Sequence, residues 1–494
     1  MSSKSKSKSK SGSRKSAAAS ASAPMEMTDK LLVVAHPDDE VLWAGANLAA
    51  ARGWHVVVSS GANNPERRRA FAKTMSWLGV SSWEMYDARA NEDSEDVDEA
   101  LPRYKKYAPF RERLAKLAKK HWSLVLTHDE EGEFGSGDNM AVHALVSEAF
   151  AYKHLGDRDW KPTQNLRFFA ADADAPLSAA ALTDKCESAR FYAPTRNLCR
   201  RMHARNWRSL KPVFVKLMRY EKLYVTPDAA PKIPAIYHQI WFGGAAPEYK
   251  THLFNKTREV AKRAGVAYKL WTNDDFKEDC FPLTWAAIQT ALEIGSETEQ
   301  SRWAQVADLA RLELMHRFGG AYFDSLIEVS PAMWPALQAA NSAPRNATFV
   351  GCNEDPCGMK CVGANGEKYL TNSFFAATWR HAVTRRAMRA VLDGEVDLKS
   401  KYINRTTGPY FLRKCILFYG AADGVYLFPT EKVFPFLVNG SEYRPAEKNQ
   451  CLGAEEPGAI QVAEGVWMIK DCLARKYPGA LAVYNSGLGG SWSW

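Results

Sequence analysis

The run LLVVAHPDDE near the start of the chain places an imidazole and two carboxylates within four residues. His36 and Asp39 are three residues apart, so both side chains can converge on one divalent ion. Asp38 is then left to accept a proton from a metal-bound water. A helix cap would need a single Asp and no histidine, so the pattern favours a metal-dependent hydrolytic site over simple capping.

The elements around this run must position these side chains. Residues 31–35 predict a buried parallel strand, and residues 44–53 predict the helix that follows it. The polar run therefore lies at the carboxyl end of a strand, where open α/β sheets place their ligand sites. Strands and helices keep alternating through residues 53–128, which favours a doubly wound parallel sheet.

The same run resembles the opening AHPDDE motif of the PIG-L/LmbE family of zinc-dependent N-acetylglucosamine deacetylases. The likeness extends over residues 29–224. It implies that His36 and Asp39 bind zinc and that Asp38 is the general base.

The second motif of that family, G-E-Y-G-H-x-x-H, supplies a catalytic histidine and a third zinc ligand. At the matching place this chain reads GEFGSGDNMAVH, so Ser136 and Asn139 replace both histidines. His128 or His143 is an alternative ligand, although His143 also fits an ordinary helix position. An open catalytic zinc site normally has three protein ligands, of which His36 and Asp39 match the family motif here.

A second group of residues with chemical potential follows residue 300. Asp308 and Arg311 are three apart on the polar face of a predicted helix, so they lie close together. A plain helix salt bridge is the alternative role for this pair. Gly319 and Gly320 end the helix, and the short strand AYF then delivers Asp324 to a loop.

This region resembles the glycosyltransferases with a DXD sugar-binding region, the family 32 type related to yeast initiating mannosyltransferases. The opening IPAIYHQIW, the central DLARLELMHRFGGAYFD, the NSFFAA and TGP segments and the closing GSW match in order. The resemblance implies a GT-A-like nucleotide-sugar fold over residues 234–494. The positions that it assigns to donor binding are His238, Trp241, Asp308, Arg311, Asp324, Asn372 and Ser373.

Transfer from a nucleotide sugar usually needs manganese or magnesium, because the diphosphate leaving group is strongly negative. In the family the last Asp of the motif ligates this metal. Here the motif reads Asp324-Ser325-Leu326, so that carboxylate is missing. Glu328, two residues further on, is the candidate substitute ligand alongside Asp324.

The charge of the chain is concentrated at its start. The 494 residues carry a formal +9, but the first 24 hold six Lys or Arg and no acid. We expect this Ser/Lys-rich tail to be disordered, with at most weak contacts to anionic partners. The rest carries only +3, which gives no reason to expect a specific nucleic-acid partner.

Cysteine usage and hydropathy give an expectation about the compartment. No apolar run reaches the roughly 18 residues of a transmembrane segment, and no secretory signal is visible. The nine cysteines favour a mixture of free thiols with at most a local disulfide. We therefore expect a soluble, cytoplasmic protein.

These observations predict an α/β chain with two Rossmann-like domains. The predicted divisions are a tail at 1–28, a deacetylase-like domain at 29–224, a proline-rich linker at 225–233 and a transferase-like domain at 234–494. The predicted function is glycan building, with retaining transfer from a nucleotide sugar to a glycan acceptor. The first domain would deacetylate or bind N-acetylated amino sugars. The alternative is a catalytically degenerate glycan-binding or assembly protein.

Overall fold

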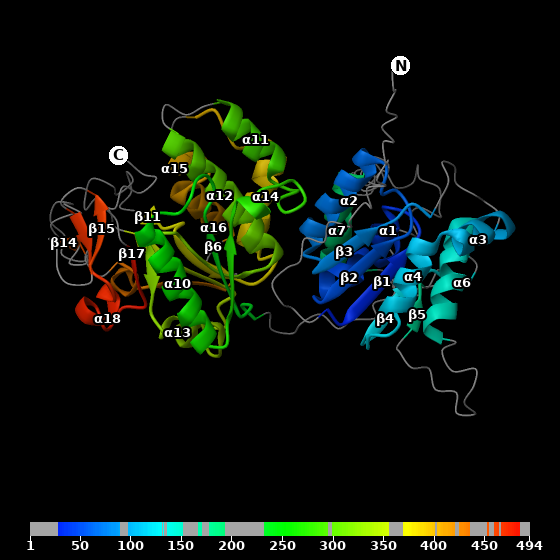
Figure 1. Cartoon of the computed structure of the whole chain (residues 1–494), viewed down its shortest axis with the longest axis horizontal. Helices are drawn as coiled ribbons and strands as arrows, with labels where there is room; N and C mark the ends of the chain where they lie inside the picture. The colour runs from blue at the N-terminus through cyan, green and yellow to red at the C-terminus, as the bar shows by residue number, and fades with distance from the viewer. Residues whose placement is uncertain are drawn as a thin grey trace, which may run out of the picture.

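The computed structural model of the chain contains two α/β parts that lie side by side along its longest axis (Figure 1). The structure describes residues 28–88, 97–130, 132, 136–151, 166–169, 177–192, 232–294, 299–354, 369–400, 403–419, 424–434, 452–453, 459–463 and 466–484. The predicted disordered tail, most of the predicted linker, the GEFG residues 133–135 and the closing GSW lie outside these ranges.

The N-terminal part is built on five parallel strands in the order β3-β2-β1-β4-β5, which confirms the predicted doubly wound sheet. Its strands are β1 (Lys30–Val34), β2 (Trp54–Val58), β3 (Ser82–Met85), β4 (Leu124–Thr127) and β5 (Leu166–Phe168). Its helices are α1 (Asp39–Ala50), α2 (Pro65–Leu78), α3 (Val97–Lys106), α4 (Ala108–Leu117), α6 (Gly137–Ala151), α7 (Ala179–Ser188) and the 3-10 turn η1 (Ala189–Phe191).

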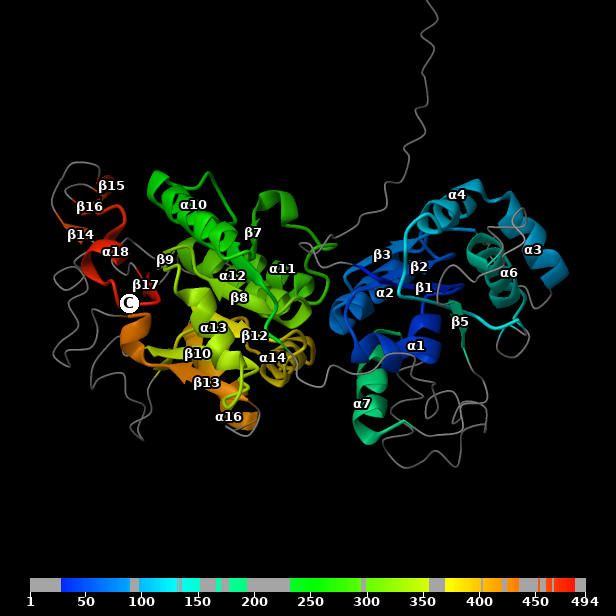
Figure 2. The ribbon, with the colours of Figure 1, turned by 90° about the horizontal axis from the view of Figure 1, so that it is seen from below.

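Alternate residues of β1 point into the two apolar layers that cover this sheet. Leu32 and Val34 pack with side chains of α1, α2 and α7, whereas Leu31 and Val33 pack with those of α3, α4 and α6. Figure 2 shows α1 and α7 lying apart from α3, α4 and α6. A strand buried on both faces explains why residues 31–35 are apolar throughout.

The C-terminal part is built on a seven-stranded mixed sheet in the order β11-β10-β12-β8-β6-β7, with β13 added beside β10. Its strands are β6 (Ile236–Ile240), β7 (Ala267–Trp271), β8 (Gly320–Phe323), β10 (Phe349–Glu354), β11 (Tyr369–Leu370), β12 (Phe374–Ala377) and β13 (Val425–Phe428). Its helices are α10 (Glu248–Arg263), α11 (Trp285–Ile294), α12 (Glu299–Arg317), α13 (Met333–Asn341), α14 (Ala382–Leu392), α15 (Ile403–Thr406) and α16 (Pro409–Tyr419), with the 3-10 turns η3 (Asn273–Asp275) and η6 (Thr430–Lys432).

Two small sheets lie at the far end of the C-terminal part (Figure 1). Strand β9 (Ile327–Val329) pairs with β17 (Ala482–Tyr484), and β14 (Leu452–Gly453), β16 (Val466–Met468) and β15 (Ile460–Ala463) form a three-stranded sheet. Helix α18 (Cys472–Lys476) lies between β16 and β17 in the sequence. The segment after Asp324 therefore returns into the core as β9.

Polar contacts join the two parts. His316 on α12 donates from Nε2 to the carbonyl oxygen of Trp77 at the end of α2, at 3.1 Å. Arg380, just before α14, donates to the carbonyl of Ala49 and to the carboxylate of Asp184 on α7, each at 3.2 Å. Because His316 and Arg380 are both buried, these hydrogen bonds belong to a desolvated interface between the two parts.

Among the described residues, no helix combines the length and the apolar character needed to cross a membrane. Cys186, Cys280, Cys352 and Cys415 are buried and form no disulfide. Cys472 is disulfide-bonded, and its partner lies outside the described residues. A disulfide is uncommon in a reducing compartment, so it weighs against the cytoplasmic expectation, which stays a prediction.

Candidate functional sites

The AHPDDE run follows β1, as predicted, but α1 begins at Asp39, before the predicted start at residue 44, so Asp39 and Glu40 belong to the first turn of the helix. Asp38 occupies the N-cap of α1 with φ 111°, a left-handed conformation that is uncommon for a residue with a side chain. Its side chain does not cap the helix, so the capping alternative is wrong. Its backbone N–H donates to the carboxylate of Glu40 at 2.9 Å. Strain of this kind is typical of functional turns.

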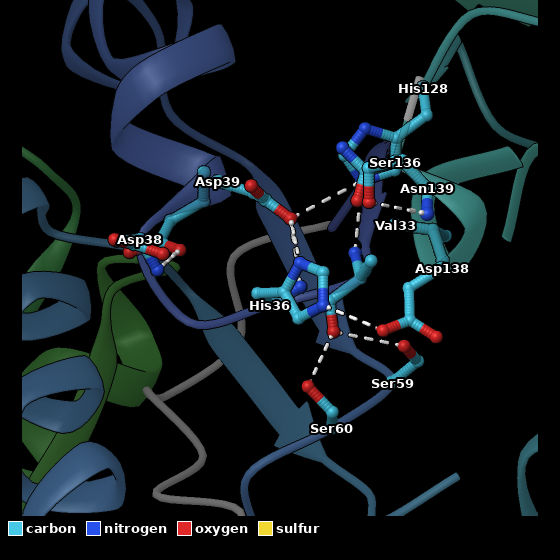
Figure 3. Close-up of polar contacts among 12 residues, drawn as sticks. Val33, His36, Asp38, Asp39, Ser59, Ser60, His128, Ser136, Asp138 and Asn139 are labelled. Atoms are coloured by element: carbon cyan, nitrogen blue, oxygen red, sulfur yellow. Dashed lines mark hydrogen bonds and ion pairs between the residues drawn. The ribbon is translucent and has the colours of Figure 1, made fainter. Parts of the chain in front are cut away.

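Figure 3 shows the ring of His36 between two carboxylates. Oδ2 of Asp39 lies 3.2 Å from Nδ1, and Oδ2 of Asp138 lies 3.2 Å from Nε2. Burial lowers the pKa of His36, but the hydrogen bonds to Asp138 and Asp39 outweigh it and raise the pKa to about 10. The two carboxylates thus favour the protonated form of the His36 ring.

The other predicted or alternative ligands are held by hydrogen bonds within the protein. Nε2 of His128 accepts from the backbone N–H of Ala35 at 2.9 Å, and Nδ1 of His143 lies 2.9 Å from the carbonyl of His128. Oγ of Ser136 accepts from the backbone N–H of Asn139 at 3.4 Å. His143 is thus a residue of α6 that orders the end of β4.

These positions do not fit a zinc ion. The 3.2 Å between His36 Nε2 and Asp138 suits two ligands that each lie about 2 Å from a tetrahedral metal. Asp39 lies at the other ring nitrogen, Nδ1, and so cannot share that metal. Its Oδ2 is also 3.5 Å from Nε2 of His128, but that nitrogen already accepts from the backbone N–H of Ala35. Within the described ranges, no group of three or more His, Cys, Asp or Glu side chains is placed to hold an ion. The zinc prediction for His36 and Asp39 therefore finds no complete ligand set, and Asp39 instead orients the His36 ring.

The buried carboxyl of Glu40, the last residue of the motif, is held by the hydroxyl of Tyr192, which donates to it at 2.7 Å. Burial raises the pKa of Glu40 to about 8 despite this hydrogen bond. Glu40 is therefore largely neutral at pH 7 and ties α1 to the segment after α7.

In the C-terminal part, the predicted donor-binding residues of α12 and β8 do come together. Oδ1 of Asp308 lies 3.4 Å from the guanidinium of Arg311, which is also 3.6 Å from Oδ2 of Asp324. The Asp308 carboxylate also accepts from Nδ2 of Asn372 at 2.8 Å and from Oγ1 of Thr407 at 3.0 Å. Burial raises the pKa of Asp308 to about 6, against the pull of Arg311. The helix pair is thus part of a larger network and more than a surface salt bridge.

The register of the sheet explains why Asn372 and Ser373 join this network. Strands β8 and β12 are antiparallel, with Phe323 opposite Phe374, so Asp324 lies level with Ser373. The backbone N–H of Asp324 donates to the carbonyl of Ser373 at 2.8 Å, and Arg311 donates to the carbonyl of Asn372 at 2.7 Å. Both residues help to hold the two aspartates in place.

His238 and Trp241, both predicted to bind the donor, differ in burial and in their position relative to β6. His238 is fully buried, donates from Nε2 to the carbonyl of Gly319 at 3.1 Å, and accepts at Nδ1 from the indole of Trp271 at 3.2 Å. Burial lowers its pKa to about 3. Because both ring nitrogens bond to protein atoms, His238 orders the core and does not reach a donor. Trp241 lies beyond the end of β6 and is half-buried.

The residues of the DXD-like segment do not fit a divalent cation. Leu326 is 2% exposed and packs in the apolar core with Ile327 and Tyr484. Glu328 lies on β9 and accepts from the backbone N–H of Leu473 at 3.4 Å. The structure therefore places Glu328 beside α18, and Asp324 is the carboxylate left for a metal. That Asp324 already faces Arg311, whose positive charge opposes a cation.

No protein-family model matches the chain. An uncharacterised protein of Acanthamoeba polyphaga mimivirus is 26% identical over 134 residues, which are 24% of this chain and 56% of that protein. The chain therefore spans about half the length of the curated relative that it matches.

Three solved structures share parts of the fold. The conserved protein TT1542 from Thermus thermophilus is 18% identical, with a TM-score of 0.26, over 37% of this chain and 88% of that one. The N,N'-diacetylchitobiose deacetylase from Pyrococcus horikoshii is 15% identical, with a TM-score of 0.26, over 38% and 75%. PaToxG Glycosyltransferase is 13% identical, with a TM-score of 0.28, over 39% and 72%. The structural neighbours thus include a deacetylase and a glycosyltransferase, at a similarity too low to support a functional argument.

Proposed function

We propose that the C-terminal part is a glycosyltransferase that moves a sugar from a nucleoside diphosphate to a glycan acceptor. The observation that carries this proposal is the network of Asp308, Arg311 and Asp324 beyond the carboxyl ends of β6 and β8. Ligands of α/β sheets bind at this edge. The resemblance implies the donor class and retention of configuration at the anomeric carbon.

The network suits recognition of a donor with many hydroxyl groups. Asp324 is partly exposed, with 13% of its side-chain surface accessible, whereas Asp308 is fully buried. Asp324 can therefore accept hydrogen bonds from sugar or ribose hydroxyls, and Asp308 fixes Arg311 behind it. Hydrogen bonds to a charged carboxylate are stronger than neutral ones, so Asp324 contributes both affinity and orientation.

The test is release of nucleoside diphosphate from a panel of nucleotide sugars by the purified full chain. We expect release from one donor class, with water as acceptor, and a loss of roughly 100-fold for Asp324→Asn. Each donor is assayed with EDTA and with manganese. Absence of release from every donor under both conditions would contradict the proposal.

For the N-terminal part we propose a binding role toward N-acetylated amino sugars without hydrolysis. The supporting observation is the bracketing of His36 by Asp39 and Asp138, which replaces the ligand set that zinc would need. If both parts lack turnover, the chain is a glycan-binding or assembly protein. The leucine at position 326, where the family has a metal-binding Asp, also favours this alternative.

This role predicts that the purified chain holds no stoichiometric zinc. Treatment with EDTA should leave the midpoint of thermal unfolding unchanged, because no metal contributes to the folded state. Metal analysis by mass spectrometry and a thermal scan measure both quantities. One zinc per chain, with a lower melting point after EDTA, would instead establish a deacetylase-type centre.

A further inference from the structure

Among the described residues, the proposed transferase site lacks the carboxylates that a divalent cation needs, yet the leaving diphosphate still needs positive charge. Magnesium and manganese prefer several oxygen ligands. Leu326 lies in the core and Glu328 lies beside α18, so Asp324 is the one carboxylate of this segment that remains as a candidate ligand. The charge must therefore come from a side chain near Asp324.

Lys250, in the first turn of α10, is the basic residue that meets this need. It is 8% exposed, and its ammonium lies 4.1 Å from the centre of the Trp241 ring. Within the described part of the chain, this ammonium makes no hydrogen bond or ion pair. Lys250 is thus a largely buried cation that packs on an aromatic face and, among the described residues, has no protein acceptor to release before it binds an anion.

Strand register brings Trp241, the aromatic partner of Lys250, close to the level of Asp324. Strands β6 and β8 are parallel, with His238 opposite Tyr322, so Ile240 lies level with Asp324 and Trp241 lies one residue beyond. The side-chain amide of Gln239 donates to the carbonyl of Asp324 at 3.2 Å, which fixes this register. Burial lowers the pKa of Lys250, and the charge of Asp324 opposes that shift.

Two other cations near this sheet edge, within the described residues, already have partners in the protein. Arg311 bonds to Asp308, Asp324 and the carbonyl of Asn372. Lys269 on β7 donates to the carboxylate of Asp275 at 2.8 Å. Lys250 alone among these three has a flexible stem and an ammonium available to a ligand.

We propose that Lys250 binds the diphosphate of the donor in place of a divalent cation, so that transfer is independent of metal. The inference rests on the transferase function proposed above. The bond between the anomeric carbon and the diphosphate oxygen breaks, and its electron pair stays on the diphosphate beside the Lys250 ammonium. The acceptor hydroxyl oxygen forms the new bond to the anomeric carbon, and its proton passes to the departing diphosphate.

The test is calorimetric titration of the full chain with UDP, GDP, ADP, CDP and dTDP, each in EDTA and then in manganese. We expect one of them to bind in EDTA, with a Kd that manganese changes by less than about twofold. Lys250→Met, which keeps the length of the side chain, should weaken binding roughly 10- to 100-fold. Lys262→Met removes an exposed lysine of the same helix and should leave the Kd unchanged.

The outcomes separate the two proposals. Binding that requires manganese would overturn the role of Lys250 and leave the transferase proposal standing. Absence of binding for all five nucleotides under both conditions would overturn both. The comparison of EDTA with manganese uses the unaltered chain, so it decides the question even if Lys250→Met fails to fold. Wild-type affinity in Lys250→Met would also overturn the inference.

Discussion

Replacing Asp308 with alanine should lower the free energy of unfolding by about 3 kcal/mol and abolish release of nucleoside diphosphate. Arg311 is 3% exposed, and the substitution removes one of the two carboxylates beside its buried charge and leaves Asp324. Nδ2 of Asn372 and Oγ1 of Thr407 lose the acceptor that both share. Burying a hydrogen-bond donor without an acceptor, or a charge without its counter-charge, lowers the stability of the folded state.

Urea denaturation at pH 7.5 measures this loss, because the pKa of Asp308 is raised to about 6 and the carboxylate is ionised there. Thr407→Val is the matched control, since it removes one hydrogen bond to the same carboxylate and should cost about 1 kcal/mol. An Asp308→Ala chain that unfolds within about 0.5 kcal/mol of the wild type would show that the network does not hold the site together.

The second large effect concerns pH and His238. Its pKa in the folded chain is about 3, because it is buried, whereas in the unfolded chain it titrates near its ordinary value of 6.5. Below pH 6.5 the unfolded chain therefore binds a proton that the folded chain does not. Stability from this group is present above pH 6.5 and is lost as the pH falls, by about 1.4 kcal/mol per unit.

His238→Gln should keep the hydrogen bond to Gly319 without this titration. Between pH 7.5 and pH 5.0, the stability difference between the wild type and the variant should shift by about 2 kcal/mol in favour of the variant. The readout is this difference, because Glu40 and Asp308 also titrate in the window and cancel in the comparison. His121→Gln alters an exposed histidine and serves as the control. A difference that stays constant with pH would mean that His238 is accessible to protons, as a donor-binding role would require.

The sequence pattern predicted the elements whose periodicity is strong. The apolar run at residues 31–35 became β1, the helical pattern after residue 300 became α12, and Gly319 and Gly320, both with positive φ, end that helix as expected. Asp308 and Arg311 were predicted to lie close together from helix spacing, and a common donor site with Asp324 was implied by the family resemblance. These features depend on residue types and spacings within short segments, which can be read from the sequence.

Contacts between distant segments could not be predicted in the same way. Asp138 directly precedes Asn139, which stands where the family has a histidine. Its pairing with His36, however, joins residues that are 102 positions apart in the sequence. Lys250 carries no motif, and its position follows from the parallel register of β6 with β8 and the start of α10. His238 matched a family position, but only the packing of Trp271 and Gly319 around it reveals its structural role. The roles of these residues depend on contacts between distant segments, which only the three-dimensional structure reveals.

The measurement that tests the central claim most directly is the rate of nucleoside diphosphate release by Asp324→Asn, on the donor that the panel identifies. Glu259→Gln on the exposed face of α10 is the control, because it makes the same carboxylate-to-amide change away from the sheet edge. A loss of roughly 100-fold for Asp324→Asn alone is the result that the account predicts. Equal rates for the wild type and both variants would place any transferase chemistry away from the edge formed by β6 and β8.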